Sequence, residues 1–166
     1  MRSAHAKASD RSETGTFGGV LGAVGLTAKH LPLEGAEWSR DLWSSKVNNL
    51  TGVQLCLAGF DVLIFGAYHR GGRDEQLLEA IDRLTREGRV TFVLLADWNE
   101  PASSLQASHW PTRLKARVVV PSNASATCWQ RSDKATLIDY ALVSDSLLRQ
   151  VKLAYEERPR QGVRPL

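Results

Sequence analysis

The 166-residue chain has 43% hydrophobic and 23% charged residues, the composition of a globular domain with room for a sizeable core. Its net charge of +3 comes from basic residues scattered along the chain, so charge alone does not establish nucleic-acid binding. Two cysteines cannot build a disulfide framework or a zinc cluster, and we find neither a signal peptide nor an apolar run of membrane-spanning length. We therefore expect an intracellular protein without a membrane segment, and the sequence leaves a nuclear location and the oligomeric state open.

The first part of the chain indicates short strands behind a polar start. Residues 1–15 are polar and are expected to form a disordered lead-in. The Gly-rich apolar segment 15–33 lacks helical spacing and indicates one or two strands. Segment 51–68 predicts two strands with a turn near Gly59.

The clearest helical pattern follows at residues 72–88. Apolar residues recur on one face of this segment, Asp74 can cap its start, and Gly88 suits its exit. Residues 89–97 are then almost continuously apolar, as expected of a strand covered on both faces.

The last part of the chain contains a predicted loop, two predicted strands and a tail. Residues 100–115 are rich in Ser and Pro and predict a loop, whereas 116–121 and 136–144 predict strands. The basic tail 158–166 either contacts phosphate or stays solvated. Several strands around one strong helix predict α+β or α/β layering in a single domain over residues 16–157.

Polar residues end the apolar strand at the sequence ADWNEP, residues 96–101. Side chains two positions apart on a strand point to the same side, so Asp97 and Asn99 are expected to place a carboxylate and a carboxamide together. The carboxylate can orient a water molecule or help to hold Mg²⁺, and the amide can donate to a phosphate oxygen. The alternative is structural, because Asn-Glu-Pro also favours a turn.

Two other predicted strands also carry polar groups at or near an end. One ends in Tyr68, His69 and Arg70, before two glycines. Asp139 lies inside the apolar segment 136–144, where an unpaired carboxylate would be costly. The three strands together indicate a polar site at strand ends, although His69 alone is equally consistent with a structural role.

The order of these segments resembles the endonuclease/exonuclease/phosphatase family, which has a DNase I-like fold. LLADWNEP is similar to that family's GDFN motif, with Ala96 in place of Gly and Trp98 in place of Phe. IDYALVS is similar to its IDY.L.S strand, and Thr127 to the Thr that commonly precedes that strand. GGVLGAV resembles the GG strand that lies before the Tyr/His strand, so the resemblance runs from about Gly18 to Val151.

The resemblance implies a fold and a set of roles. The fold is an α+β, DNase I-like two-sheet β-sandwich flanked by helices, and the activity is Mg²⁺- or Mn²⁺-dependent cleavage of phosphoesters. Asp97 is then expected to orient the attacking water, and Asn99 to contact the scissile phosphate. Tyr68 and His69 stand where the family places phosphate-contacting or supporting side chains, and Asp139 is expected to orient the supporting network. The candidates for substrate binding are Arg70, Thr127 and Trp110.

Tryptophan side chains are candidate stacking platforms for nucleic-acid bases. Trp110 lies in the predicted loop and is the better candidate for this role. Trp98 alternates with Asp97 and Asn99, so it is expected to point away from the site and into the core.

The chain departs from the family pattern towards both ends. No Asn-bearing strand and metal-binding Glu can be matched ahead of the Gly-Gly strand, because Glu13 lies too close to that strand. The closing Ser-Asp-His is also unmatched, since Ser146 stands after Ser144 and Asp145 where His is expected, and residues 145–166 contain no His. We therefore expect an incomplete domain, truncated at both ends, with no firmly matched metal ligand.

Two functions are open from the sequence. The first is a metal-dependent phosphodiester hydrolase that acts on DNA, similar to the endonuclease part of a non-long-terminal-repeat retrotransposon, with weak or no activity because of the unmatched residues. The second is a catalytically inactive remnant that only binds nucleic acid or protein. Cleavage of DNA, RNA, phosphoinositides and sphingomyelin shares this fold, so the sequence does not fix the substrate.

Overall fold

The computed structural model describes residues 2–6, 10–12, 15–17, 20–24, 29–32, 50–57, 60–68, 73–88, 91–129 and 135–155. The strands are β1 (Arg2–Ala6), β2 (Asp10–Ser12), β3 (Gly15–Phe17), β4 (Val20–Val24), β5 (Lys29–Pro32), β6 (Leu50–Leu57), β7 (Phe60–Tyr68), β8 (Thr91–Asp97), β9 (Ala116–Val119), β10 (Cys128–Trp129), β11 (Ala135–Thr136) and β12 (Asp139–Ser144). The helices are α2 (Glu75–Gly88), α3 (Ala102–Gln106), α4 (Trp110–Arg113) and the 3₁₀ turn η3 (Asp145–Leu147). Within these ranges no helix has the length and apolar character needed to cross a membrane.

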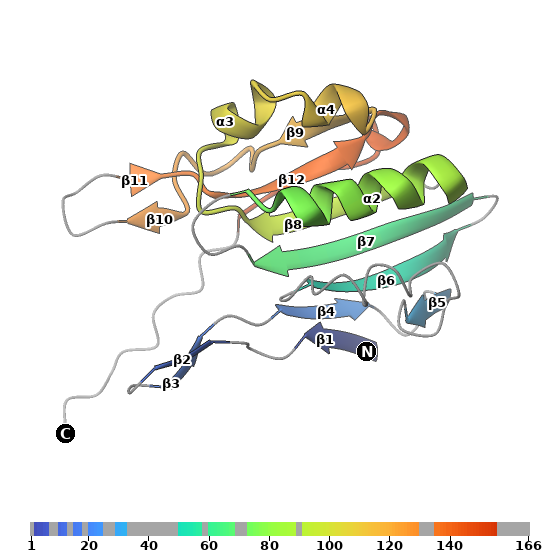
Figure 1. Cartoon of the computed structure of the whole chain (residues 1–166), viewed down its shortest axis with the longest axis horizontal. Coiled ribbons are helices and arrows are strands. Elements are labelled where there is room, and N and C mark those ends of the chain that lie inside the picture. Colours follow the sequence, from blue (N-terminus) through green and yellow to red (C-terminus); the bar gives the residue numbers. More distant parts are fainter. Residues whose placement is uncertain are drawn as a thin grey trace.

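A six-stranded mixed sheet forms the centre of the fold, with the strand order β5-β6-β7-β8-β12-β9 (Figure 1). The strands β7 and β8 are parallel and α2 lies between them in the chain, whereas the other neighbours are antiparallel. Three two-stranded sheets pair β1 with β4, β2 with β3, and β10 with β11. The β1–β4 pair lies against β6 and β7. A mixed sheet with flanking helices confirms the predicted α+β class.

Helix α2 covers one face of this sheet. Figure 1 shows it lying along β7 and β8. Its apolar residues recur on one side and join the main buried cluster, which includes Leu63, Phe65, Leu77, Leu78, Ile81, Phe92 and Leu94. The Leu77 N–H donates to Asp74 Oδ1 at 3.0 Å, which confirms the predicted cap.

A second, smaller cluster covers part of the opposite face. It contains Val62, Val93, Ala141, Val143 and Leu147, with Val151 and Leu153 packed against it. The segment that carries the last two residues is held by Asn123, whose side chain donates to the Tyr155 carbonyl and accepts from the Tyr155 N–H, both at 2.7 Å. Both faces of the central strands are therefore packed, as the continuous apolar run at residues 89–97 predicted.

Two segments differ from the sequence-based expectation. Strands β1 and β2 lie within residues 1–15, where we expected a disordered lead-in; they pair with β4 and β3. The predicted loop 100–115 contains the helices α3 and α4. These helices have five and four residues, which is too short for a helical repeat to appear in the sequence.

Candidate functional site

Three strands bring polar side chains to one edge of the central sheet. In the parallel pair of β7 and β8, Tyr68 is the register partner of Asp97, and each is the last residue of its strand. In the antiparallel pair of β8 and β12, Asp97 is the partner of Asp139, the first residue of β12. The structure therefore brings Tyr68, Asp97 and Asp139 together at one edge of the sheet.

These three residues lie on the face of the sheet that is opposite α2. Successive residues of a strand alternate between faces, and register partners share one. Phe92, Leu94 and Ala96 belong to the cluster under α2, so Asp97 belongs to the other face. Tyr68, Asp97 and Asp139 are all partly exposed, and Leu95, on the same face, is 39% exposed. The polar edge is therefore partly accessible on that side of the sheet.

Asp97 and Asn99 are linked by a turn and not by strand alternation. The strand β8 ends at Asp97, and Asn99 is exposed with a left-handed backbone, φ 49°. The Asn99 N–H donates to Asp97 Oδ1 at 3.1 Å. The Asp97 side chain thus closes an Asx-type turn onto the backbone of Asn99, and Asn tolerates the left-handed backbone of this turn better than most residues. The functional and the turn interpretations of Asp97-Trp98-Asn99 are compatible.

The Asp97 carboxyl group has an unusual electrostatic environment. Burial raises its pKa, the hydrogen bond from the Asn99 N–H opposes this, and the negative charge of Asp139 raises the pKa further. Two carboxylates that face each other disfavour simultaneous ionisation. A raised pKa at a polar strand end is typical of a functional site, although structural networks also produce it.

Thr127 supports the start of β12. Its hydroxyl oxygen accepts the N–H of Ile138 at 3.1 Å and the N–H of Asp139 at 3.0 Å. The Thr127 N–H also donates to the Thr136 carbonyl at 3.0 Å. These bonds give Thr127 a positioning role beside Asp139; the substrate contact that we expected from the sequence stays a prediction.

Trp98 lies in the core, as the sequence predicted. Its side chain is fully buried and stacks on Tyr140 with ring centroids 5.4 Å apart. The indole N–H donates to the Tyr140 carbonyl at 3.1 Å, and the Trp98 N–H donates to the Ile138 carbonyl at 2.9 Å. Trp98 therefore joins the end of β8 to the start of β12.

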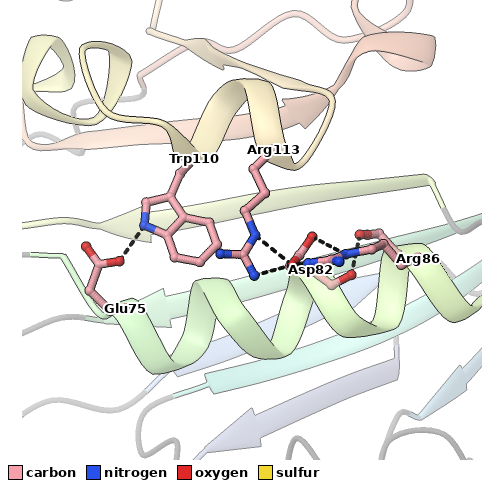
Figure 2. Close-up of polar contacts among 6 residues, drawn as sticks. Glu75, Asp82, Arg86, Trp110 and Arg113 are labelled. Carbon is pink, nitrogen blue, oxygen red and sulfur yellow. Dashed lines mark hydrogen bonds and ion pairs between the residues drawn. The ribbon is translucent and has the colours of Figure 1, made fainter.

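Trp110 corrects a prediction, because it cannot serve as an exposed stacking platform. Its side chain is 1% exposed and lies between α4 and α2. Figure 2 shows its indole N–H pointing to the Glu75 carboxylate, while the Arg113 guanidinium lies 4.8 Å from the ring centroid. Arg113 also bonds Asp82 at 2.7 Å. The sequence pattern of a Ser- and Pro-rich loop concealed this docked helix.

The sequence reasoning missed a buried polar cluster on the α2 side of the same edge. Arg73 Nε lies 3.5 Å from Glu100 Oε1, and Tyr140 is 2% exposed. Burial raises the pKa of Tyr140, the Glu100 carboxylate adds to this, and Arg73 opposes it. The sequence could have indicated these residues through their neighbours, because Glu100 directly follows the Asp97–Asn99 turn and Tyr140 directly follows Asp139.

Two predicted site residues, His69 and Arg70, lie outside the described residues. In the part of the chain that the structure describes, no group of three or more His, Cys, Asp and Glu residues could hold a metal ion. Among the described candidates, the structure brings Tyr68, Asp97, Asn99, Asp139 and Thr127 to one edge and leaves Trp110 in the core.

Comparison with known proteins finds solved structures of similar fold at low sequence identity. No family model matches the chain, and no curated protein matches it by sequence. The endonuclease domain of TRAS1, a telomere-specific non-LTR retrotransposon, aligns with a TM-score of 0.57 and 13% identity over 88% of this chain and 69% of that domain. A β-hairpin deletion mutant of beta toxin from Staphylococcus aureus aligns with a TM-score of 0.50 and 13% identity over 69% of this chain and 51% of the toxin.

A third structure, an endonuclease/exonuclease/phosphatase family protein from Bacteroides thetaiotaomicron, has 17% identity over 58% of this chain and 40% of that protein, and its TM-score of 0.37 carries no argument. The chain spans 69% of the TRAS1 domain and about half of the toxin. At sequence identities of 13%, these similarities show a shared fold and do not show a shared activity. The chain therefore has a fold similar to that of the TRAS1 endonuclease domain.

Proposed function

We propose that the chain is a phosphodiester hydrolase domain of the DNase I-like sandwich type, which acts on DNA and uses Mg²⁺ or Mn²⁺. The observation that carries this proposal is the meeting of Tyr68, Asp97 and Asp139 at one sheet edge, with Asn99 in the adjoining turn. The fold similarity to a retrotransposon endonuclease domain supports the choice of a nucleic-acid substrate.

The residues at this edge suit work on a phosphodiester. The Asp97 carboxylate can accept a proton from a water molecule and so orient it for attack on phosphorus. Because burial and Asp139 raise its pKa, Asp97 is a stronger base than an ordinary aspartate. The exposed Asn99 amide and the Tyr68 hydroxyl can donate to phosphate oxygens as negative charge develops there.

The donor set at this edge is compatible with a divalent cation. Asp97 and Asp139 are register partners whose like charges oppose each other, and a cation between such carboxylates would relieve that repulsion. Mg²⁺ commonly takes one or two carboxylates and completes its shell with water and substrate oxygens. When bound there it would supply positive charge to a phosphate group.

The first experiment is nicking of supercoiled plasmid by the purified chain in Mg²⁺ and in Mn²⁺. Asp97→Asn keeps the shape of the side chain and removes the base, so we expect nicking to fall by about 10²-fold or more. Asp145→Asn is the matched control, because Asp145 is exposed and lies at the opposite end of β12, where it pairs with Arg117 at 3.3 Å.

Each outcome has a definite meaning. Nicking that needs a metal ion, survives Asp145→Asn and is lost in Asp97→Asn supports the hydrolase proposal. A folded chain that binds DNA but does not nick it leaves the second function, a module that only binds nucleic acid. Equal nicking by wild type and Asp97→Asn points to a contaminating nuclease and contradicts the proposed role of Asp97.

A further inference from the structure

Three side chains with buried polar atoms, which we call the Arg73 cluster, come from the loop that follows β8 and from its two neighbouring segments. Its members are Arg73, Glu100 and Tyr140. Arg73 Nε lies 3.5 Å from Glu100 Oε1 and 3.4 Å from Oε1 of the more exposed Glu75, and the Arg73 and Glu100 side chains are 24% and 15% exposed. The Tyr140 hydroxyl is buried as well, and its pKa responds to both charges. The cluster therefore gathers two opposite charges and a phenol in a poorly solvated place.

Each member follows one of the candidate site residues in the chain. Arg73 precedes α2 on the segment that leaves Tyr68, and Glu100 lies three residues after Asp97. Tyr140 directly follows Asp139 on β12. One cluster therefore connects the three chain segments that deliver the polar edge.

The cluster lies across the sheet from the two carboxylates. Tyr140 belongs to the buried cluster on the α2 side, whereas Asp139 is on the opposite face because neighbouring strand residues alternate. The cluster cannot touch a substrate held at the carboxylates. Its effect on that site must pass through the position of the backbone.

The polar atoms of the cluster lack direct hydrogen bonds. Arg73 Nε, Glu100 Oε1 and the Tyr140 hydroxyl are all buried, and no described atom forms a hydrogen bond with any of them. Leaving such atoms unsatisfied is expensive, and proteins commonly satisfy them with an internal water molecule that makes about three bonds. Arg73 Nε is a donor, Glu100 Oε1 is an acceptor and the hydroxyl is both, so a water molecule within reach of all three would match their hydrogen-bonding groups.

We propose that Arg73, Glu100 and Tyr140, joined by one internal water molecule, form a positioning network that holds the loop 98–100 and with it the Asp97–Asn99 turn. Buried ion pairs are seldom better for stability than apolar residues of the same size. In this network the three residues fix the position of the loop, because they connect it to the start of α2 and to β12. The consequence for catalysis rests on the proposed function, whereas the consequence for loop order does not.

The Asn99 amide hydrogen reports directly on this network, since it is bonded to Asp97 Oδ1 at 3.1 Å. We expect its exchange with solvent to become about tenfold faster in Glu100→Gln and in Arg73→Gln, because each change costs the loop roughly one net hydrogen bond. The double variant should exchange at nearly the same rate as each single variant, because the two changes break one network. Tyr140→Phe, which keeps the ring stacked on Trp98, should accelerate exchange by a smaller factor.

Matched controls separate the network from general stability. Glu79→Gln changes an exposed carboxylate of α2, and Tyr155→Phe removes a hydroxyl in a segment distant in sequence from the cluster; neither should alter Asn99 exchange. Unchanged Asn99 exchange in both Glu100→Gln and Arg73→Gln overturns the proposal. Exchange that rises equally at Asn99 and in the centre of β8 also overturns it, because that pattern is a loss of global stability.

A high-resolution crystal structure tests the water molecule itself. Solvent density within hydrogen-bond distance of the three polar atoms is expected, and a dry cluster contradicts that part of the proposal. If the wild type nicks DNA, Glu100→Gln should lower kcat with KM nearly unchanged, as expected of a residue that orients the base. If the wild type does not nick DNA, the proposed function fails, and the exchange experiment still decides whether the network holds the loop.

Discussion

At the scale of single residues, Asp97 combines a chemical role with a cost in stability. Its folded-state pKa is raised, first by burial and then by Asp139, so the native state favours its neutral form. A group of this kind contributes stability below its unfolded pKa, and this contribution disappears as pH rises through the folded pKa. Near neutral pH the ionised Asp97 therefore destabilises the fold.

We expect Asp97→Asn to raise the melting temperature at pH 7 by about 2 °C or less, because the half-buried position is screened by solvent. The difference should shrink as pH falls through the folded pKa and vanish well below the ordinary Asp value of 3.8, where the wild-type carboxyl group is neutral in both states. Thermal unfolding in EDTA at pH 7 and at progressively lower pH measures both values. A lower melting temperature at pH 7 would show that the carboxylate is stabilised by interactions stronger than those with Asn99.

The Thr127 side chain has a different role, because its hydroxyl group holds the backbone at the start of β12. Thr127→Val keeps the shape but leaves the N–H groups of Ile138 and Asp139 without their acceptor, at an expected cost of about 1–3 kcal/mol. Thr127→Ser retains the hydroxyl and should cost less. Urea unfolding of both variants compares them, and equal losses would indicate that the methyl packing of Thr127 matters more than its hydroxyl.

The burial of one tryptophan could be predicted from the sequence, and the burial of another could not. The buried position of Trp98 was predictable because strand alternation relates it to Ala96 and Asp97. Trp110 was not, because its burial depends on Glu75 and Arg113, which are contacts from another helix and from its own next turn. Sequence periodicity carries no information about such a docking partner.

At the scale of elements, α4 is attached to α2 by a buried carboxylate. Asp82 is 1% exposed and bonds both Arg86 on its own helix and Arg113 on α4 (Figure 2). The hydrogen bond from Arg86 is the largest cause that lowers the pKa of Asp82, burial opposes it, and Arg113 lowers the pKa further. A depressed pKa means that ionised Asp82 stabilises the fold above its unfolded pKa.

We expect Asp82→Asn to reduce the free energy of unfolding by about 1.5–3 kcal/mol at pH 7, the range for hydrogen bonds to charged groups. The wild type should lose this advantage only as pH falls below the ordinary Asp value of 3.8 and through the folded pKa. Urea unfolding at pH 7 and near pH 3 provides the comparison, with the exposed Glu79→Gln as control. An advantage that is independent of pH would mean that Asp82 acts through packing and not through its charge.

Helices and strands were predicted well where the pattern of apolar residues was long, and poorly where it was short. The helix over 72–88 and the strand over 89–97 were recognised because each carries a clear apolar pattern, and the meeting of strand ends followed from their polar last residues. The pairing of β1 with β4 was missed because β1 is polar, and such a strand is specified by its distant partner.

At the scale of the whole molecule, the distribution of basic residues determines how strongly DNA binding depends on salt. The 21 Lys and Arg residues are scattered along the chain and nearly balanced by 18 acidic residues, so we expect few phosphate contacts and a moderate salt dependence. For about three phosphate contacts, the affinity for duplex DNA should fall roughly 40-fold between 50 and 200 mM salt. Fluorescence anisotropy with a labelled duplex measures this slope. Affinity that does not change with salt would contradict a phosphate-directed mode of binding.

The left-handed backbone at Asn99 limits how this chain can change over evolutionary time. Glycine, asparagine and aspartate accept such a backbone readily, whereas β-branched residues do not. A lineage that loses the amide chemistry can therefore keep its shape by drifting to glycine, while a drift to valine would disrupt the turn itself. The identity of residue 99 across a lineage would thus distinguish a site under functional selection from one that is kept only as a turn.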